Sequence, residues 1–387
     1  MAFDFATPVE RRAPEGQYAS QKWHRYAADV LPLWVADMDF HSPPAVIDAL
    51  QRRVAHGVYG YGEVPATLSE ALCQWSAHHY AWSIEPEWQQ WLPGVVPALH
   101  FAAMALTQPG EGVLTIAPIY PPFLAVAERT GRLAQQAMLA EPAAPGEPWR
   151  LDIEALEAAI TPQTRLLLWC HPHNPTGRVW TLRELEQLAA VVERHDLWVV
   201  SDELHCDLLL DEGARHRPLA ALFPELAKRT ITLWAPSKTF NLAGLTSACA
   251  VIPDPTLRHR FAEATKGFLP DGNVLGLVAA EAAYREGEPW RQALLDVLRR
   301  HRTALEARVA TWPGVSLSAP ESTYLAWLDM RDAGLGETPA QTLLKKAGVA
   351  LSEGAAFGCP GFVRLNFGTT ASQLEAALSR MDALLKA

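Results

Sequence analysis

The segment LWAPSKTFNLAGL, residues 233–245, is the most informative stretch of this chain for its fold and function. Its apolar run stops at Ala235-Pro236-Ser237, and Lys238 follows directly. This order is typical of a strand that ends in a tight turn. A lysine amine has an ordinary pKa of about 10.4 and becomes a nucleophile at neutral pH in a desolvated place. The apolar neighbours predict such a place, so Lys238 is a candidate Schiff-base lysine with a hydroxyl for an anion at Ser237. By itself the segment also fits a surface lysine in a strand-to-helix turn.

Short aliphatic runs alternate with longer segments of helical period around this segment. The alternation predicts an α/β fold with a mainly parallel sheet. One helix is expected at 181–195, where Thr181 and Glu184 have the spacing of a capping box. The expected strands are 113–117, 166–170, 197–201, 230–234 and 248–252.

The last quarter of the chain predicts a second, smaller domain. Residues 297–309 have the pattern of one long helix that ends at Trp312-Pro313-Gly314. Shorter elements at 324–328, 339–347, 362–367 and 371–385 indicate an α+β arrangement. A boundary is expected near Glu286 to Pro289. Residues 45–287 then form the large domain, and 1–44 with 288–387 form the small one.

Composition restricts the class of partner. The 387 residues are 49% hydrophobic and 20% charged, which is ordinary for a globular protein with a large core. A formal net charge of -10 without a basic cluster argues against nucleic acid. No apolar run reaches the roughly 20 residues that a membrane span needs. Five scattered cysteines and an N-terminus without an apolar signal core predict reduced thiols in the cytoplasm. A small-molecule partner is expected.

Polar side chains follow three of the expected strands. HPHNPTG at 171–177 brings Asn174, DELHCD at 202–207 brings Asp202, and APSK at 235–238 brings Lys238. In open α/β sheets, ligands bind beyond the carboxyl ends of the strands. An amide, a carboxylate and an amine at neighbouring strand ends suit an aromatic aldehyde with a ring nitrogen, a phenolic oxygen and a phosphate. The sequence therefore predicts pyridoxal 5'-phosphate as the cofactor.

Eight motifs occur in one order along nearly the whole chain. They are WVADMDF (34–40), YGYG (59–62), PGVVPAL (93–99), PIYPPF (118–123), HNPTG (173–177), SDELHCDL (201–208), SKTFNLAGL (237–245) and FVRLNFG (362–368). In these motifs the chain resembles fold-type I pyridoxal-phosphate enzymes of the class I/II aminotransferase superfamily, and within them the MalY/PatB-type cystathionine β-lyases, or cysteine-S-conjugate β-lyases. The resemblance implies a large domain with a mainly parallel, seven-stranded type of sheet and a smaller α+β domain.

The resemblance also implies roles for the residues at the inner part of the site. Lys238 would bind the cofactor's aldehyde and then act as the base. Asp202 would pair with the ring nitrogen, and Asn174 would donate to the phenolic oxygen and contact the substrate. Tyr120 would stack on the ring as a further catalytic residue, although a core tyrosine beside two prolines fits the same sequence. Arg364 would bind the substrate's α-carboxylate.

At the phosphate, the resemblance implies backbone groups and a second subunit. The amides of Val95 and Val96, at the start of a helix expected near Pro97, would hold the phosphate together with Ser237. Tyr61 would reach the phosphate from the partner subunit. A homodimer is therefore expected.

Two positions differ from typical aminotransferases of the superfamily, namely His205 and Thr246, and Ala235 departs from the family itself. His205 stands where a tyrosine bonds the phenolic oxygen, and this histidine is what the β-lyase branch shows; a packed histidine at a strand end is the alternative. Thr246 stands where a phosphate-binding arginine is usual. Ala235 replaces a common serine, which removes one hydroxyl from the expected phosphate site.

A zinc site is the rival interpretation of the same loops, using His171, His173, His205 and Cys206. These residues lack the paired spacing of zinc ligands, and pyridoxal phosphate explains the loops better, so no metal is expected. Cys170 and Cys206 have no matching nucleophile pattern and are expected to be buried thiols.

The expected function is β-elimination of L-cystathionine or other cysteine S-conjugates to a thiol, pyruvate and ammonia. Two alternatives remain open at this point. One is an aminotransferase with nearly the same machinery, and the other is a regulatory binding protein that uses the same fold.

Overall fold

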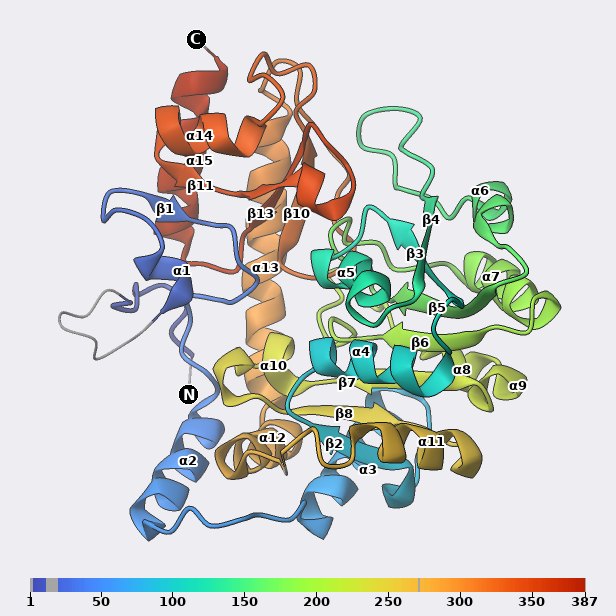
Figure 1. Cartoon of the computed structure of the whole chain (residues 1–387). Helices are drawn as coiled ribbons and strands as arrows, with labels where there is room; N and C mark the ends of the chain where they lie inside the picture. Colours follow the sequence, from blue (N-terminus) through green and yellow to red (C-terminus); the bar gives the residue numbers. More distant parts are fainter. Residues whose placement is uncertain (1–2, 12–19, 271, 387) are drawn as a thin grey trace.

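A seven-stranded sheet organises the middle of the chain in the computed structural model, which describes residues 3–11, 20–270 and 272–386 (Figure 1). The strand order is β2-β8-β7-β6-β5-β3-β4. The strands are β2 (Gln89–Leu92), β3 (Gly112–Ala117), β4 (Leu133–Met138), β5 (Thr164–Cys170), β6 (Trp198–Asp202), β7 (Thr230–Trp234) and β8 (Ala248–Val251). Strands β3 to β7 pair in parallel, and β8 is antiparallel to both of its neighbours. The prediction of a mainly parallel sheet is confirmed.

The five expected strands are all present, and β7 has the expected bounds. The ends of the other four were wrong by one or two residues; in particular β6 begins at Trp198 and extends to Asp202. Strands β2 and β4 were not predicted. The sequence of β4, LAQQAM, lies at the edge of the sheet with most of its side chains at least partly exposed. An edge strand of this kind lacks the aliphatic run on which the prediction depended.

Helices cover both faces of this sheet. Along β5, Leu166 and Leu168 pack in a cluster with α4 (Val95–Leu106), α5 (Pro121–Arg129) and α11 (Pro255–Thr265). Leu167 and Trp169 pack on the opposite face with α6 (Ile153–Ala159) and α7 (Leu182–Arg194). This alternation is why the buried strands read as continuous apolar runs. The capping box of Thr181 and Glu184 at the start of α7 is confirmed.

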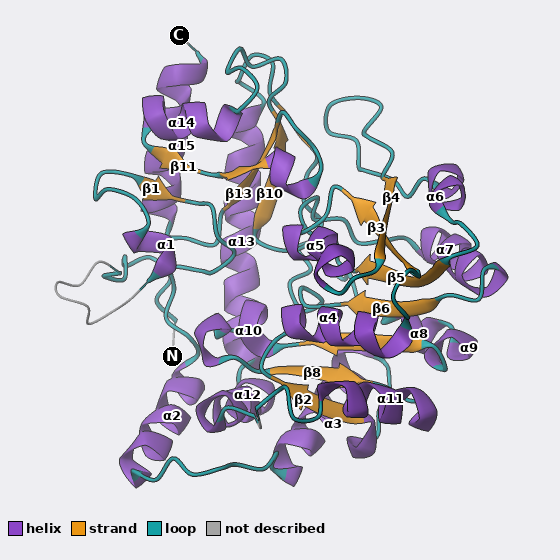
Figure 2. Cartoon of the chain, in the orientation of Figure 1, coloured by secondary structure: helices purple, strands orange, loops and turns teal. Residues whose placement is uncertain are grey.

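The remaining helices of this region are short or lie near the β2 and β8 edge (Figure 2). They are α2 (Pro44–His56), α3 (Ala66–Tyr80), α8 (Leu219–Leu222), α9 (Pro224–Ala227), α10 (Pro236–Thr239) and α12 (Val274–Glu286), with single turns at Pro86–Trp88 and Ala243–Leu245. Within the described ranges, no helix has the length and apolar character to cross a membrane.

A second, antiparallel sheet lies in the C-terminal part. Its order is β12 (Ser352–Glu353), β13 (Phe362–Asn366), β10 (Leu325–Asp329) and β9 (Ser316–Leu317), with a turn at Gly354–Phe357 beside it. The helices α14 (Pro339–Ala347) and α15 (Ala371–Leu385) have the expected bounds. The long helix α13 was predicted too short, because it spans Glu288–Val309. Pro289 occupies the first turn of α13, where a missing amide costs nothing.

The N-terminal segment joins this C-terminal part. Strand β1 (Leu31–Pro32) pairs in parallel with β11 (Val349–Ala350), after the short helix α1 (Gln21–His24). Figure 1 shows both segments beside α15 and away from the large sheet. We propose on this basis the division into residues 45–287 and residues 1–44 with 288–387.

Candidate active site

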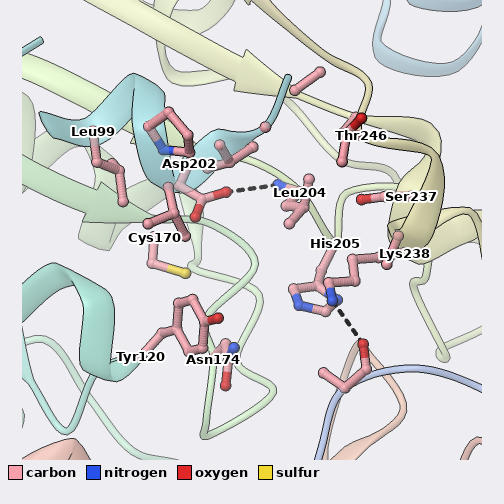
Figure 3. Close-up of a pocket in the computed structure, with 18 of the residues that line it drawn as sticks. Leu99, Tyr120, Cys170, Asn174, Asp202, Leu204, His205, Ser237, Lys238 and Thr246 are labelled. Atoms are coloured by element: carbon pink, nitrogen blue, oxygen red, sulfur yellow. Dashed lines mark hydrogen bonds between the residues drawn. The ribbon is translucent and has the colours of Figure 1, made fainter. Parts of the chain in front are cut away.

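A cavity of about 260 Å³ lies where β5, β6 and β7 end (Figure 3). One wall comes from β13 and another from residues 35 and 36. Polar groups from segments far apart in sequence therefore face one enclosed space. Nine of the ten predicted site residues line it: Val95, Val96, Tyr120, Asn174, Asp202, His205, Ser237, Lys238 and Arg364.

Lys238 projects into this cavity from α10. Pro236 begins that helix directly after the Ala235 turn, which places the lysine one residue past Ser237. The Lys238 Nζ atom donates a hydrogen bond to the backbone oxygen of Ala36 at 2.6 Å (Figure 3). Desolvation lowers the pKa of Lys238 to about 8, partly opposed by the negative charge of Asp37. About a tenth of the amine is therefore neutral at pH 7, far more than for a lysine of ordinary pKa.

Asp202 is the last residue of β6 and its carboxylate faces the cavity (Figure 3). The amide of Leu204 donates to Asp202 Oδ1 at 3.1 Å. Burial raises the pKa of Asp202 to about 7, and the nearby Glu203 adds to this rise. A buried carboxyl of this kind becomes fully ionised when a cation binds beside it. A protonated pyridine nitrogen is such a cation.

Arg364 lies in the middle of β13 and orients Asn174. Its Nη1 donates to Asn174 Oδ1 at 3.0 Å, and its Nη2 donates to the Trp34 oxygen at 3.1 Å. Because arginine has donors only, the Asn174 oxygen faces Arg364 and the amide nitrogen stays available for an acceptor. The guanidinium lies 4.8 Å from the ring centre of Phe357. Its buried Nε has no hydrogen-bond partner among the described residues, so it can still bind a carboxylate.

His205 and Tyr120 add two neutral rings to the wall. His205 follows β6 and is 3% exposed. Burial, together with the charges of Lys238 and Arg364, lowers the pKa of His205 to about 3. Its buried Nδ1 has no partner within the described ranges, so the neutral ring has hydrogen-bonding capacity for a ligand. Tyr120 caps α5, and burial raises the pKa of its hydroxyl.

The start of α4 forms a further wall of the cavity. The helix begins at Val95 after Gly94, so the expected start near Pro97 was wrong. Residues before a proline disfavour helical geometry, which explains the error, but the missing amide of Pro97 is tolerated within the first turn. The amides of Val95 and Val96 have no acceptor within the helix and suit an anion.

Hydroxyl groups also face the cavity. Ser237, Thr246 and Ser247 line it, whereas Ala235 contributes no hydroxyl. The buried Ser247 Oγ has no hydrogen-bond partner in the described part of the chain. Sequence reasoning missed Ser247, because it belongs to no motif and follows Thr246 at the end of a turn. Backbone amides, hydroxyls, a carboxyl and an amine thus face one cavity, and this set fits pyridoxal phosphate.

Tyr61 is not in this cavity. It lies in the segment between α2 and α3 and is fully exposed. It lines a separate surface hollow with Tyr59 and with residues between Gly267 and Val274. Within one chain, the structure therefore does not bring Tyr61 to the other site residues.

The side chains proposed for the rival zinc site have separate neighbours. His173 Nδ1 lies 2.8 Å from Thr176 Oγ1, and Cys206 Sγ lies 3.1 Å from the Tyr80 hydroxyl. The His171 ring packs against His216 instead. Across residues 3–11, 20–270 and 272–386, no group of three or more His, Cys, Asp or Glu side chains is placed to hold a metal ion.

Residues 28–381 match the model of the aminotransferase class I and II family, and the chain belongs to this family. It is 37% identical to cystathionine beta-lyase PatB of Bacillus subtilis (strain 168), over 95% of this chain and 96% of the relative. The solved structure of OvoB is 43% identical with a TM-score of 0.92, covering 98% of this chain and 100% of that one. Cystalysin from Treponema denticola, solved with a pyridoxal 5'-phosphate cofactor, is 32% identical with a TM-score of 0.93, covering 100% and 99%.

Proposed function

We propose that this protein is a carbon-sulfur β-lyase that uses pyridoxal 5'-phosphate. Its substrate would be L-cystathionine or another cysteine S-conjugate, and its products a thiol, pyruvate and ammonia. The observation that carries the proposal is one cavity lined by Lys238, Asp202 and Arg364, with His205 and Thr246 at the two positions that differ from typical aminotransferases. The similarity to PatB, a cystathionine beta-lyase by name, supports the same conclusion.

The cofactor would be held by groups that line the cavity. Asp202 would face the ring nitrogen, the Asn174 amide and His205 would face the phenolic oxygen, and Tyr120 would cover the ring. Val95, Val96 and Ser237 would hold the phosphate, with Ser247 as an added hydroxyl. Pyridoxal phosphate supplies an aldehyde that binds amines and a ring that accepts electrons from the substrate's α-carbon.

Arg364 and Lys238 would carry out the chemistry on the substrate. The free Nε of Arg364 would bind the α-carboxylate and so fix the amino acid in one orientation. Lys238, with its pKa lowered to about 8, would accept the α-proton as a neutral amine. The carbon-sulfur bond at the β-carbon would then break, and the thiolate would leave. Water would convert the remaining unsaturated amine to pyruvate and ammonia.

We propose further that the active unit is a homodimer. Several apolar side chains are exposed around the segment between α2 and α3, and such a patch is typical of an interface. They are Val54, Val58, Tyr59, Tyr61, Val64 and Phe268. A second copy seated there would bury them and would bring Tyr61 to the partner's phosphate site. Because this occupant is another copy of the same chain, two sites per dimer would be completed together.

We also propose that the protein works in the cytoplasm on small amino acids, without nucleic acid or membrane partners. All five cysteines are free, and Cys170, Cys206, Cys249 and Cys359 are buried. The net charge of -10 gives no attraction to nucleic acid.

The test is product release from a panel of cysteine conjugates, measured with and without an added keto acid. We expect pyruvate and thiol in equal amounts and no keto-acid requirement. Amino transfer that depends on a keto acid and outpaces pyruvate formation from cystathionine would instead assign the protein to the aminotransferases. Cofactor binding without turnover of any conjugate would favour the regulatory alternative.

A further inference from the structure

Residues 34–37 form a segment in which Val35 and Ala36 line the cavity, and we call this segment the strap. Each backbone carbonyl of the strap accepts a hydrogen bond from at least one side chain. The Trp34 oxygen accepts from Ser352 Oγ and Arg364 Nη2, and the Val35 oxygen accepts from Asn366 Nδ2. The Ala36 oxygen accepts from Lys238 Nζ and the Tyr324 hydroxyl. The Asp37 oxygen accepts from Asn366 Nδ2 and Lys22 Nζ. A short loop with every carbonyl fixed in this way has few orientations available to it.

Asn366 fixes the strap on both sides of Ala36. Its amide nitrogen donates to the Val35 oxygen at 2.7 Å and to the Asp37 oxygen at 2.6 Å. The Gly368 amide donates to Asn366 Oδ1 at 2.7 Å, which prevents the side-chain amide from turning over. The Ala36 carbonyl is therefore left to point away from these two contacts, toward Lys238 and Tyr324.

The Ala36 oxygen has two lone pairs and two donors. Lys238 Nζ lies at 2.6 Å and the Tyr324 hydroxyl at 3.1 Å. Tyr324 is 1% exposed, and burial raises the pKa of its hydroxyl, so it stays a neutral donor. Because a carbonyl binds one donor on each lone pair, a fixed tyrosine on one side turns the other lone pair toward the lysine.

We propose that the Ala36 carbonyl is the docking point of the Lys238 amine whenever that amine is not bound to the cofactor, and that Tyr324 is the positioning residue that orients this carbonyl. The inference rests on the proposed function of Lys238. A carbonyl accepts no proton, but it binds an ammonium more strongly than an amine. The lysine that has just accepted the α-proton is thus held in one place beside the substrate.

Several charged or titratable groups face Lys238 besides this carbonyl. The negative charges of Asp37 and Asp202 raise the pKa of its amine, whereas Arg364 lowers it. His205 also lies near the amine and stays neutral at neutral pH. A test must therefore leave these four residues unchanged. Tyr324→Phe does so, because it removes one hydroxyl and retains the ring.

The experiment measures the reactivity of Lys238 in the cofactor-free protein. Trace acetic anhydride would be applied across a pH series, and labelling at Lys238 would be read by peptide mapping against the exposed Lys266. When the Ala36 carbonyl is no longer oriented, Lys238 loses a contact that favours its ammonium form over its neutral amine. In Tyr324→Phe we therefore expect the labelling midpoint to move down by about half a pH unit, or about threefold faster labelling at a fixed pH.

Ser352→Ala is the matched control. This change removes the hydrogen bond from Ser352 Oγ to the Trp34 carbonyl of the same strap, and the Trp34 carbonyl still accepts from Arg364. We expect its labelling curve to match that of the unmodified protein. In the cofactor-loaded enzyme, Tyr324→Phe should lower kcat about threefold and leave KM within about twofold, since docking concerns the proton-transfer step.

Equal labelling midpoints in Tyr324→Phe, Ser352→Ala and the unmodified protein would overturn the proposal. If Tyr324→Phe does not fold, Asn366→Ser replaces it with the same expected shift, because it releases both carbonyls that flank Ala36. A failure of the proposed role of Lys238 shows separately, since borohydride would then leave no cofactor fixed to Lys238 in the unmodified protein, and a failure of the β-lyase function shows in the pyruvate assay, while labelling still reports the contact with Ala36.

Discussion

Two sets of residues in the cavity differ in what they present to a ligand, and we name the charged set the inner end and the neutral set the outer end. The inner end has charged groups removed from water, namely Lys238, Asp202 and Arg364, and their pKa values are shifted to about 8, 7 and 10 by burial. The outer end has the amides that begin α4 and the hydroxyls of Ser237 and Ser247. The lysine and the arginine are the cations among the described residues that line the cavity, and both belong to the inner end.

The difference between charged and neutral groups indicates which part of the cofactor a single chain holds firmly and which part needs further contacts. Charged groups in a desolvated place are held by fixed contacts such as the pair of Arg364 and Asn174. Neutral donors at the outer end hold a phosphate more weakly, because hydrogen bonds from charged groups are about twice as strong. The outer end therefore depends more on the covalent bond to the cofactor and on the proposed contribution of Tyr61.

The largest change should come from the inner end. In Lys238→Ala we expect β-elimination to fall at least about a thousandfold, because both the covalent attachment and the general base are lost. Borohydride followed by peptide mapping should find no fixed cofactor at position 238. Lys266→Ala, at an exposed lysine paired with Glu263, is the control and should behave as the unmodified protein. A reduced adduct at another lysine of the unmodified protein would contradict the assignment.

Asp202→Asn should have the next largest effect. We expect activity to fall about a hundredfold, because a neutral amide no longer stabilises a protonated ring nitrogen. Free energies of unfolding of the cofactor-free protein supply a second measurement. The pKa of Asp202 is about 7 in the folded chain against an ordinary 3.8, so the folded state binds more protons in this window. Stability should therefore fall as pH rises from 4 to 7.

The change in the free energy of unfolding between pH 5 and pH 8, compared between the two proteins, isolates the contribution of the Asp202 carboxyl. The unmodified protein should lose more stability over that range than Asp202→Asn does. His205 has a folded pKa of about 3, so it adds stability as pH rises to its ordinary 6.5, but equally in both proteins. The Lys238 pKa of about 8 acts mainly above this range. Asp48→Asn, at an exposed position, is the control, and an equal change in all three proteins would contradict the prediction.

A cation added at the outer end should strengthen the hold on the phosphate. In Thr246→Arg we expect the amine form of the cofactor, which has no covalent bond, to dissociate about tenfold more slowly, as one charge-assisted hydrogen bond would produce. Thr246→Gln, with a long neutral side chain, is the matched control. Dissociation is followed by separating free from bound cofactor over time. Equal rates in both variants would show that the phosphate does not lie near residue 246.

The smallest expected effect concerns the partner subunit. Lys238→Ala and Tyr61→Phe would be mixed in equal amounts and allowed to exchange subunits. Random exchange makes half of the dimers mixed, and each mixed dimer has one native site, so about a quarter of all sites should be native. Activity should then exceed the average of the two parents. No gain after demonstrated exchange would mean that Tyr61 does not complete a neighbouring site.

Sequence reasoning predicted the inner end better than the outer end, for a physical reason. Asn174, Asp202 and Lys238 each follow a buried strand, and the carboxyl ends of parallel strands meet at one edge of a sheet. The apolar runs thus predict both the strands and the convergence of these residues. The mainly parallel fold and the α/β class follow from the same runs.

The parts that sequence reasoning missed depend on long-range contacts or on weak local signals. The start of α4 was wrong because Pro97 is a stronger local signal than Gly94. Strand β4 was missed because its side chains are polar and exposed at the sheet edge. The contact of Tyr324 with the Ala36 carbonyl joins residues 288 positions apart and has no local pattern.

The strap also determines when the site can be completed as the chain is made. Its carbonyls are synthesised early, but Arg364 and Asn366 bind them across 330 and 331 positions of sequence. Contacts of such separation form late, because the intervening chain must first be ordered. A nascent chain that has already made Lys238 and Asp202 therefore still has an unfixed strap and no arginine for the substrate. Capture of the amino acid should be among the last properties that the growing protein acquires.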